Sequence, residues 1–123
     1  MTKKVYVIED NAKNMKLFKA ILNLIPNIEV FEEIRGDLGL ELIKSGEPDL
    51  IILDIQLPGM SGIEICTELR KIDKFKDVPI VAVTSFAMKG DKERILSAGF
   101  TTYVSKPIKV VDFRELVNQY VGN

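Results

Sequence analysis

Residues 50–59 read LIILDIQLPG, and this stretch decides what kind of fold the chain can adopt. Four aliphatic residues stand together, and Asp54 follows them directly. A short unbroken apolar run that ends in turn residues such as Pro58 and Gly59 is typical of a strand buried on both faces, as in the centre of a parallel sheet. A carboxylate at the end of such a strand is costly to bury alone, so Asp54 needs a cation or a hydrogen-bond donor beside it.

Further apolar runs lie on both sides of this stretch, and segments of helical period separate them. The runs at 5–8 and 78–83 are strong, whereas those at 28–34 and 101–104 are weaker. Apolar residues at helical spacing predict four helices, and a polar segment at 87–98 that contains Gly90 is predicted to form a fifth, weaker one. The apolar residues that mark the four helices are Leu17, Phe18, Ile21, Leu22 and Ile25 within 12–25, ended by Pro26; Leu38, Leu42 and Ile43 before Gly46 and Pro48; Ile65, Cys66, Leu69 and Ile72; and Val110, Phe113, Leu116, Val117 and Tyr120.

Strand and helix therefore alternate five times, which predicts an α/β fold with a parallel sheet and helices on both faces. The two weaker strands, the second and the fifth, should form the edges. The flavodoxin-like order 2-1-3-4-5 places them there, so we expect a doubly wound (βα)5 domain of three α/β/α layers. The length fits one domain over 1–123, and no output domain is expected.

Composition excludes several classes of function. The 17 basic and 18 acidic residues are mixed along the chain, which argues against binding to nucleic acid or to a membrane surface. The chain has no histidine and only one cysteine, Cys66, so a zinc site, a histidine base and an internal disulfide are excluded. The first residues do not form a signal peptide, and no run approaches the ~20 apolar residues of a membrane span. We expect a cytoplasmic protein.

Polar side chains follow four of the five expected strands. They are Glu9 and Asp10 after the first, Asp54 after the third, Thr84 and Ser85 after the fourth, and Ser105 and Lys106 after the fifth. Because the carboxyl ends of parallel strands meet at one edge of a sheet, these side chains should lie together. Two carboxylates ~4 Å apart repel each other by about 4 kcal/mol at an effective dielectric near 20. Oxygen ligands without histidine or cysteine favour Mg2+, with Mn2+ as a possible substitute.

The same edge suits a phosphoryl group. Lys106 adds a positive charge there, and the hydroxyl of Thr84 adds a hydrogen-bond donor. Asp54, between the cation and the lysine, is then placed as a carboxylate nucleophile that can form an acyl phosphate.

Several spaced motifs resemble the signature of response-regulator receiver domains, the CheY-like family. These motifs are EDN at 9–11, LDIQLPGMSG at 53–62, VAVTS at 81–85 and YVSKP at 103–107. The stretches NMKLF at 14–18 and FAMKGDKERI at 86–95 further resemble a stand-alone member of the family that acts in cell division. The resemblance covers essentially the whole chain.

The resemblance implies a phosphorylation-operated signalling protein rather than an enzyme. A partner histidine kinase or histidine phosphotransfer protein would supply the phosphoryl group to Asp54, and a downstream regulatory protein would read the surface of the last two helices and the fifth strand. The residue roles that it implies are metal binding by Asp10, Asp54 and the backbone carbonyl of Gln56, with Glu9 acting through water; phosphate binding by Thr84, Ser85 and Lys106; and switching by Thr84 and Tyr103. The bond before Pro107 is often cis in the family. Many members have aspartate where Glu9 stands.

Other interpretations of these residues stay open at this point. A Mg2+-dependent phosphohydrolase of the haloacid dehalogenase type also uses a strand-end aspartate, but it has a second aspartate where this chain has Gln56. A flavodoxin needs a phosphate loop after the first strand, and EDNAKN at 9–14 is acidic. Glu9 and Asp10 could instead cap a helix, with Asn11 as a further capping candidate. The sequence RGD at 35–37 is most simply a chance match.

Overall fold

Five parallel strands form one sheet in the computed structural model, which describes residues 2–85 and 89–122. The strands are β1 (Lys3–Ile8), β2 (Ile28–Glu33), β3 (Leu50–Asp54), β4 (Ile80–Thr84) and β5 (Thr102–Ser105). Their order across the sheet is β2-β1-β3-β4-β5, and all neighbouring pairs are parallel. The predicted order is confirmed, and the two weaker runs are the edge strands.

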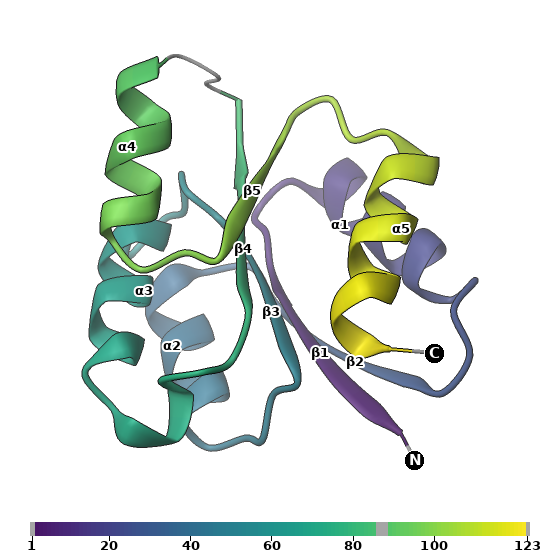
Figure 1. Cartoon of the computed structure of the whole chain (residues 1–123), viewed down its shortest axis with the longest axis horizontal. Helices are drawn as coiled ribbons and strands as arrows, with labels where there is room; N and C mark the ends of the chain where they lie inside the picture. Colours follow the sequence, from purple (N-terminus) through teal and green to yellow (C-terminus); the bar gives the residue numbers. More distant parts are fainter. Residues whose placement is uncertain (1, 86–88, 123) are drawn as a thin grey trace.

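Helices cover both faces of this sheet. They are α1 (Ala12–Leu22), α2 (Gly36–Lys44), α3 (Gly62–Arg70), α4 (Lys89–Ser97) and α5 (Val110–Val121), with a short 3-10 helix, η1 (Asp73–Phe75). Figure 1 shows α1 and α5 on one side of the sheet and α2, α3 and α4 on the other. The three-layer α/β/α prediction is therefore confirmed. Within residues 2–85 and 89–122, no helix has both the length and the apolar character needed to cross a membrane.

The central strands are buried on both faces because their side chains alternate between two cores. In β3, Leu50 and Ile52 point into the core under α1 and α5, whereas Ile51 and Leu53 point into the core under α2 and α3. All five residues of β3 are buried, Asp54 included. The apolar run in the sequence thus marks the centre of the sheet, and its last residue lies at the edge where the chain leaves the core.

Element ends differ from the predicted ones by a few residues, and each difference has a local cause. Helix α1 ends at Leu22 rather than at residue 25, because the N–H groups of Leu24 and Ile25 bond to carbonyls three residues back. Ile25 is nevertheless buried, so the apolar period continues beyond the helix. Strand β4 begins after Pro79, which has no N–H for the ladder. The predicted helix at 87–98 is α4, and residues 86–88, where it was expected to begin, lie outside the described part of the chain.

Candidate functional site

The carboxyl ends of four strands bring the predicted polar residues to one edge of the sheet. Asp54 is the last residue of β3 and Thr84 the last residue of β4, while Glu9 and Lys106 directly follow β1 and β5. The ladder continues to these positions, because Asp54 is in register with Val83 and the N–H of Lys106 donates to the carbonyl of Thr84 at 2.8 Å. The parallel topology alone therefore places the site.

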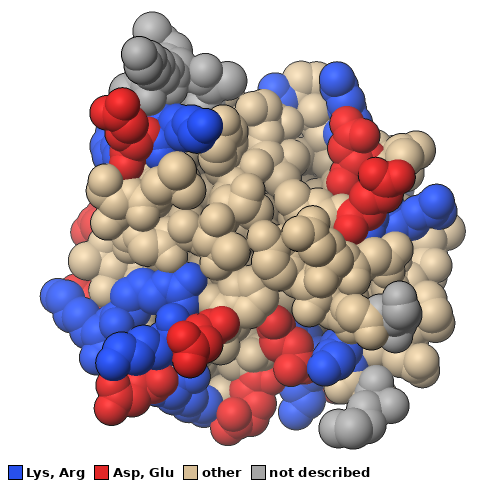
Figure 2. All heavy atoms as spheres, viewed as in Figure 1, with Lys and Arg blue, Asp and Glu red and all other residues tan. Residues whose placement is uncertain are grey.

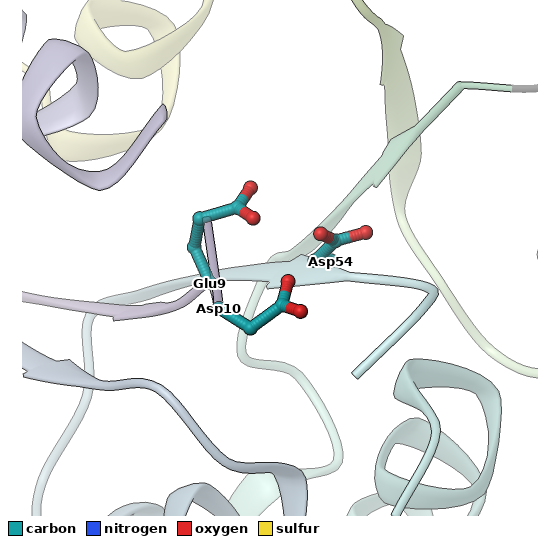
Figure 3. Close-up of side chains that lie close together, drawn as sticks. All are labelled: Glu9, Asp10 and Asp54. Atoms are coloured by element: carbon teal, nitrogen blue, oxygen red, sulfur yellow. The ribbon is translucent and has the colours of Figure 1, made fainter. Parts of the chain in front are cut away.

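Three carboxylates meet at this edge. One oxygen each from Glu9, Asp10 and Asp54 lies within 4.8 Å of the others. Figure 3 shows Glu9 and Asp10 at the end of β1 beside Asp54 at the end of β3. The side chains of Glu9 and Asp54 are buried, whereas Asp10 is exposed to solvent. Asn11 caps α1 by accepting a hydrogen bond from the N–H of Asn14 at 3.0 Å, so the open question of the helix cap is resolved in favour of Asn11.

Lys106 joins two of the acids. Its Nζ lies 3.0 Å from Asp54 Oδ2 and 3.4 Å from Glu9 Oε1. Burial alone would lower the pKa of Lys106, but the hydrogen bond and charge of Asp54, together with Glu9, raise it above its ordinary value. Lys106 is therefore a permanent cation within reach of Asp54, as predicted from its place after β5. The peptide bond between Lys106 and Pro107 is cis, as the resemblance implied.

Burial strongly affects the carboxyl group of Glu9. Burial is the main cause that raises the pKa of Glu9 to about 7, and the hydrogen bond to Asp54 adds to it. Glu9 Oε2 accepts a hydrogen bond from the N–H of Asn11 at 3.1 Å. Within residues 2–85 and 89–122, Glu9 Oε1 meets no hydrogen-bond donor, despite its distance of 3.4 Å from Lys106 Nζ.

This donor set fits a hard divalent cation. All of its side-chain ligands are carboxylate oxygens, one of them is a buried oxygen without a donor, and the group has an excess of negative charge. A cation such as Mg2+ would reduce the repulsion among the acids, and a water bound to it would donate a hydrogen bond to Glu9 Oε1. The acidic cluster is therefore a candidate metal centre.

The loop after Asp54 orients the carboxylate itself. The N–H of Gln56 donates to Asp54 Oδ1 at 3.1 Å, while Lys106 binds the other oxygen. Gln56 is exposed and follows Asp54 by two positions, so its backbone lies beside the acidic cluster. No signal in the sequence distinguishes this backbone donor from any other loop residue.

The remaining predicted residues lie around this centre. The side chain of Thr84 is buried at the end of β4, and Ser85 is exposed just beyond it. Tyr103, in the middle of β5, is partly buried against the core under α3 and α4. It also lines a cavity of about 450 Å³ between β5 and α5, together with Lys106 and Leu116.

Known proteins share both the sequence pattern and the fold. Residues 5–118 match the response regulator receiver domain. The chain is 44% identical over 126 residues to the polar-differentiation response regulator DivK of Brucella ovis, an alignment that covers 100% of this chain and 99% of that protein.

Two solved structures are similar over nearly their full lengths. The receiver domain of a sensor histidine kinase from Pseudomonas aeruginosa PAO1, with a magnesium ion coordinated in its active site cleft, has a TM-score of 0.89 and 27% identity, and each chain is covered completely. Chemotaxis protein CheY4 of Vibrio cholerae also has a TM-score of 0.89, with 22% identity over 98% of this chain and 99% of that one, a likeness that concerns the fold. The strand-end acids, the lysine after β5 and the full-length match lead to one conclusion: the chain belongs to the response regulator receiver domain family.

Proposed function

We propose that this protein is a phosphorylation-operated switch that accepts a phosphoryl group on Asp54 from the phosphohistidine of a partner kinase or phosphotransfer protein. The observation that carries the proposal is the placement of Asp54, with one oxygen 3.0 Å from Lys106 Nζ and the three-carboxylate cluster beside it. The chain itself has no histidine, so a phosphohistidine donor must be supplied by another protein.

The side chains divide the chemistry among them. Asp54 attacks phosphorus as the bond to the donor nitrogen breaks, which leaves an acyl phosphate on Asp54 and a neutral histidine on the partner. Lys106 pairs with the phosphoryl oxygens, and the Thr84 hydroxyl and the Ser85 N–H donate to them. Asp10, Asp54 and the backbone carbonyl of Gln56 would hold Mg2+, or Mn2+ in its place, with Glu9 acting through water. When bound, the ion would offset the negative charge of the carboxylates and the phosphoryl group.

The switch acts through protein contact. A phosphoryl group that draws Thr84 toward it makes room beside β5, and Tyr103, which is only partly buried, can then pack further inward. The surface formed by α4, β5 and α5 is the face that a downstream regulatory protein would read. Figure 2 shows that the middle of this face carries few charged side chains, which suits a protein partner.

The wider setting follows the Brucella relative. We place the protein in the cytoplasm, as one receiver domain over 1–123, with a role in cell-cycle control that the 44% identity to a polar-differentiation response regulator supports. It assists only its own phosphorylation and dephosphorylation. A phosphohydrolase of the haloacid dehalogenase type is disfavoured because Gln56 has no carboxyl group to act as general acid.

The test is chemical phosphorylation with acetyl phosphate and Mg2+, followed by intact-protein mass spectrometry. We expect one phosphoryl group on the wild-type protein and none on Asp54→Asn. Asp10→Asn should accept a phosphoryl group only at a higher Mg2+ concentration than the wild type, because it lacks one carboxylate of the metal centre. Glu41→Gln, which removes one exposed carboxylate on α2, should behave as the wild type. Phosphorylation of Asp54→Asn at the wild-type rate, or steady turnover of small phosphate esters, would contradict the proposal.

A further inference from the structure

The N-terminal turn of α2 with its N-cap, residues 35–37, packs directly against the loop that follows Asp54. The N–H of Gly36 donates to the carbonyl of Pro58 at 2.9 Å, and Gly36 is buried. A Cβ atom on Gly36 would lie only 1.8 Å from the backbone oxygen of Met60. The approach of these two backbones therefore requires glycine at position 36, and any side chain there must displace one segment or the other.

The charged residues on either side of Gly36 close the same contact. Arg35 Nε lies 3.0 Å from Asp37 Oδ1, and Arg35 Nη2 lies 3.3 Å from Asp37 Oδ2. The guanidinium lowers the pKa of Asp37 through this hydrogen bond. Gly59 lies against the pair: at its φ of +85°, an added Cβ would be 2.4 Å from Asp37 Oδ1 and 2.9 Å from Arg35 Nη2. The RGD sequence is thus a brace at the surface: the half-exposed side chains of Arg35 and Asp37 pair with each other, and the glycine between them is buried.

The loop after Asp54 also makes close backbone contacts at its other end. The N–H of Gly62 donates to the carbonyl of Ile55 at 2.9 Å, and a Cβ on Gly62 would lie 2.2 Å from the backbone oxygen of Asp54. Ser61 and Glu64 form a reciprocal capping box that fixes the start of α3. Gln56, whose N–H binds Asp54 Oδ1, lies between these two fixed points.

We infer that the turn at Arg35, Gly36 and Asp37 is a positioning element for the metal centre, because it fixes the loop 55–60 and with it the backbone carbonyl of Gln56. The inference rests on the proposed function, in which that carbonyl is a metal ligand. Mg2+ requires near-octahedral geometry with ligands at about 2.0–2.1 Å, so a small displacement of the loop weakens binding. Partners that orient metal ligands typically change metal affinity by about 10–100-fold when they are removed.

The experiment compares two glycine substitutions at opposite ends of α2. In Gly36→Ala the new methyl group meets the loop backbone at 1.8 Å, whereas in Gly46→Ala, two residues beyond the end of α2, it meets the hydroxyl of Tyr6 at 1.9 Å. The midpoint of Mg2+ binding, the concentration at which half of the sites in the folded protein are occupied, is obtained for each folded variant by fitting the dependence of the melting temperature on Mg2+ concentration. We expect this midpoint to rise about tenfold for Gly36→Ala and to stay at the wild-type value for Gly46→Ala, even where both melting temperatures fall. Equal midpoints for Gly36→Ala and the wild type would overturn the inference.

A milder pair of variants keeps the test decisive if Gly36→Ala does not fold. Asp37→Asn breaks the charge pair without changing its shape, and Glu41→Gln removes one exposed carboxylate elsewhere on α2. A midpoint that rises several-fold for Asp37→Asn but not for Glu41→Gln supports the inference, whereas equal midpoints for the two variants contradict it. If the wild type itself shows no response to Mg2+, the proposed metal centre fails; if the wild type responds and the turn variants respond identically, only the role of the turn fails.

Discussion

Glu9→Gln isolates the cost of keeping a carboxylate buried at the end of β1. Only 1% of Glu9 is exposed, and burial raises its pKa from 4.5 to about 7. Between these two pH values the folded protein binds a proton that the unfolded chain has released, so stability must fall as the pH rises through this window. The interval between the two pKa values corresponds to about 3 kcal/mol of the free energy of unfolding, and this contribution is fully lost above about pH 7. Glutamine has almost the same shape, remains uncharged and can still accept the hydrogen bond from Asn11.

The assay is urea unfolding in the presence of a chelator at several pH values. Relative to the wild type, Glu9→Gln should show little change near pH 4.5 and a gain of about 3 kcal/mol near pH 8. Lys106 stays charged throughout, because its pKa is raised further above the range of the experiment. Millimolar Mg2+ should reduce the difference at pH 8, since the cation offsets the charge on Glu9. A difference that is the same at all pH values would refute the reasoning.

Three further outcomes follow from other contacts. Lys106→Met should bind Mg2+ more tightly, in a metal titration of the melting temperature, yet accept a phosphoryl group from acetyl phosphate at least tenfold more slowly; a parallel loss of both would contradict this. Arg70→Met should lower the free energy of unfolding by about 3 kcal/mol, because Arg70 donates to the carbonyls of Phe75, Val78 and Gly99 at 2.7–2.9 Å; an unchanged urea midpoint would count against it. Cys66 should react with a thiol reagent only on unfolding, because burial raises its pKa to about 11; rapid labelling of the native protein would exclude this.

The parts of the site that the sequence predicts are those fixed by topology. Once β3 is a central parallel strand, Asp54 must lie at the same edge as the residues that follow β1, β4 and β5. Lys106 is 52 positions from Asp54 along the chain, yet its place after the last strand suffices to bring the two side chains together. The positions of the site residues thus follow from the strand order and the strand ends, and neither depends on the details of side-chain packing.

The parts that the sequence does not predict depend on contacts between loops. The depth at which Glu9 is buried follows from its neighbours at the ends of other strands, not from its own position after β1. The contact of Gly36 with Pro58 joins two loops, and no periodicity marks either of them. For the same reason the sequence alone favours a chance match for RGD at 35–37, because the contact of these residues with the loop after Asp54 is visible only in the structure.

Charge explains why one lysine should affect metal binding and phosphorylation in opposite directions. With every group ionised, the three carboxylates exceed Lys106 by two negative charges, and one divalent cation neutralises the site. Loss of Lys106 leaves that site more negative and therefore more attractive to Mg2+. Phosphorylation instead replaces the single charge of Asp54 by about −1.5 to −2 on the phosphoryl group, which one cation cannot balance alone. In the proposed reaction Lys106 would thus compete with the metal before phosphorylation and complement it afterwards, and its position 3.0 Å from Asp54 Oδ2 suits it to both roles.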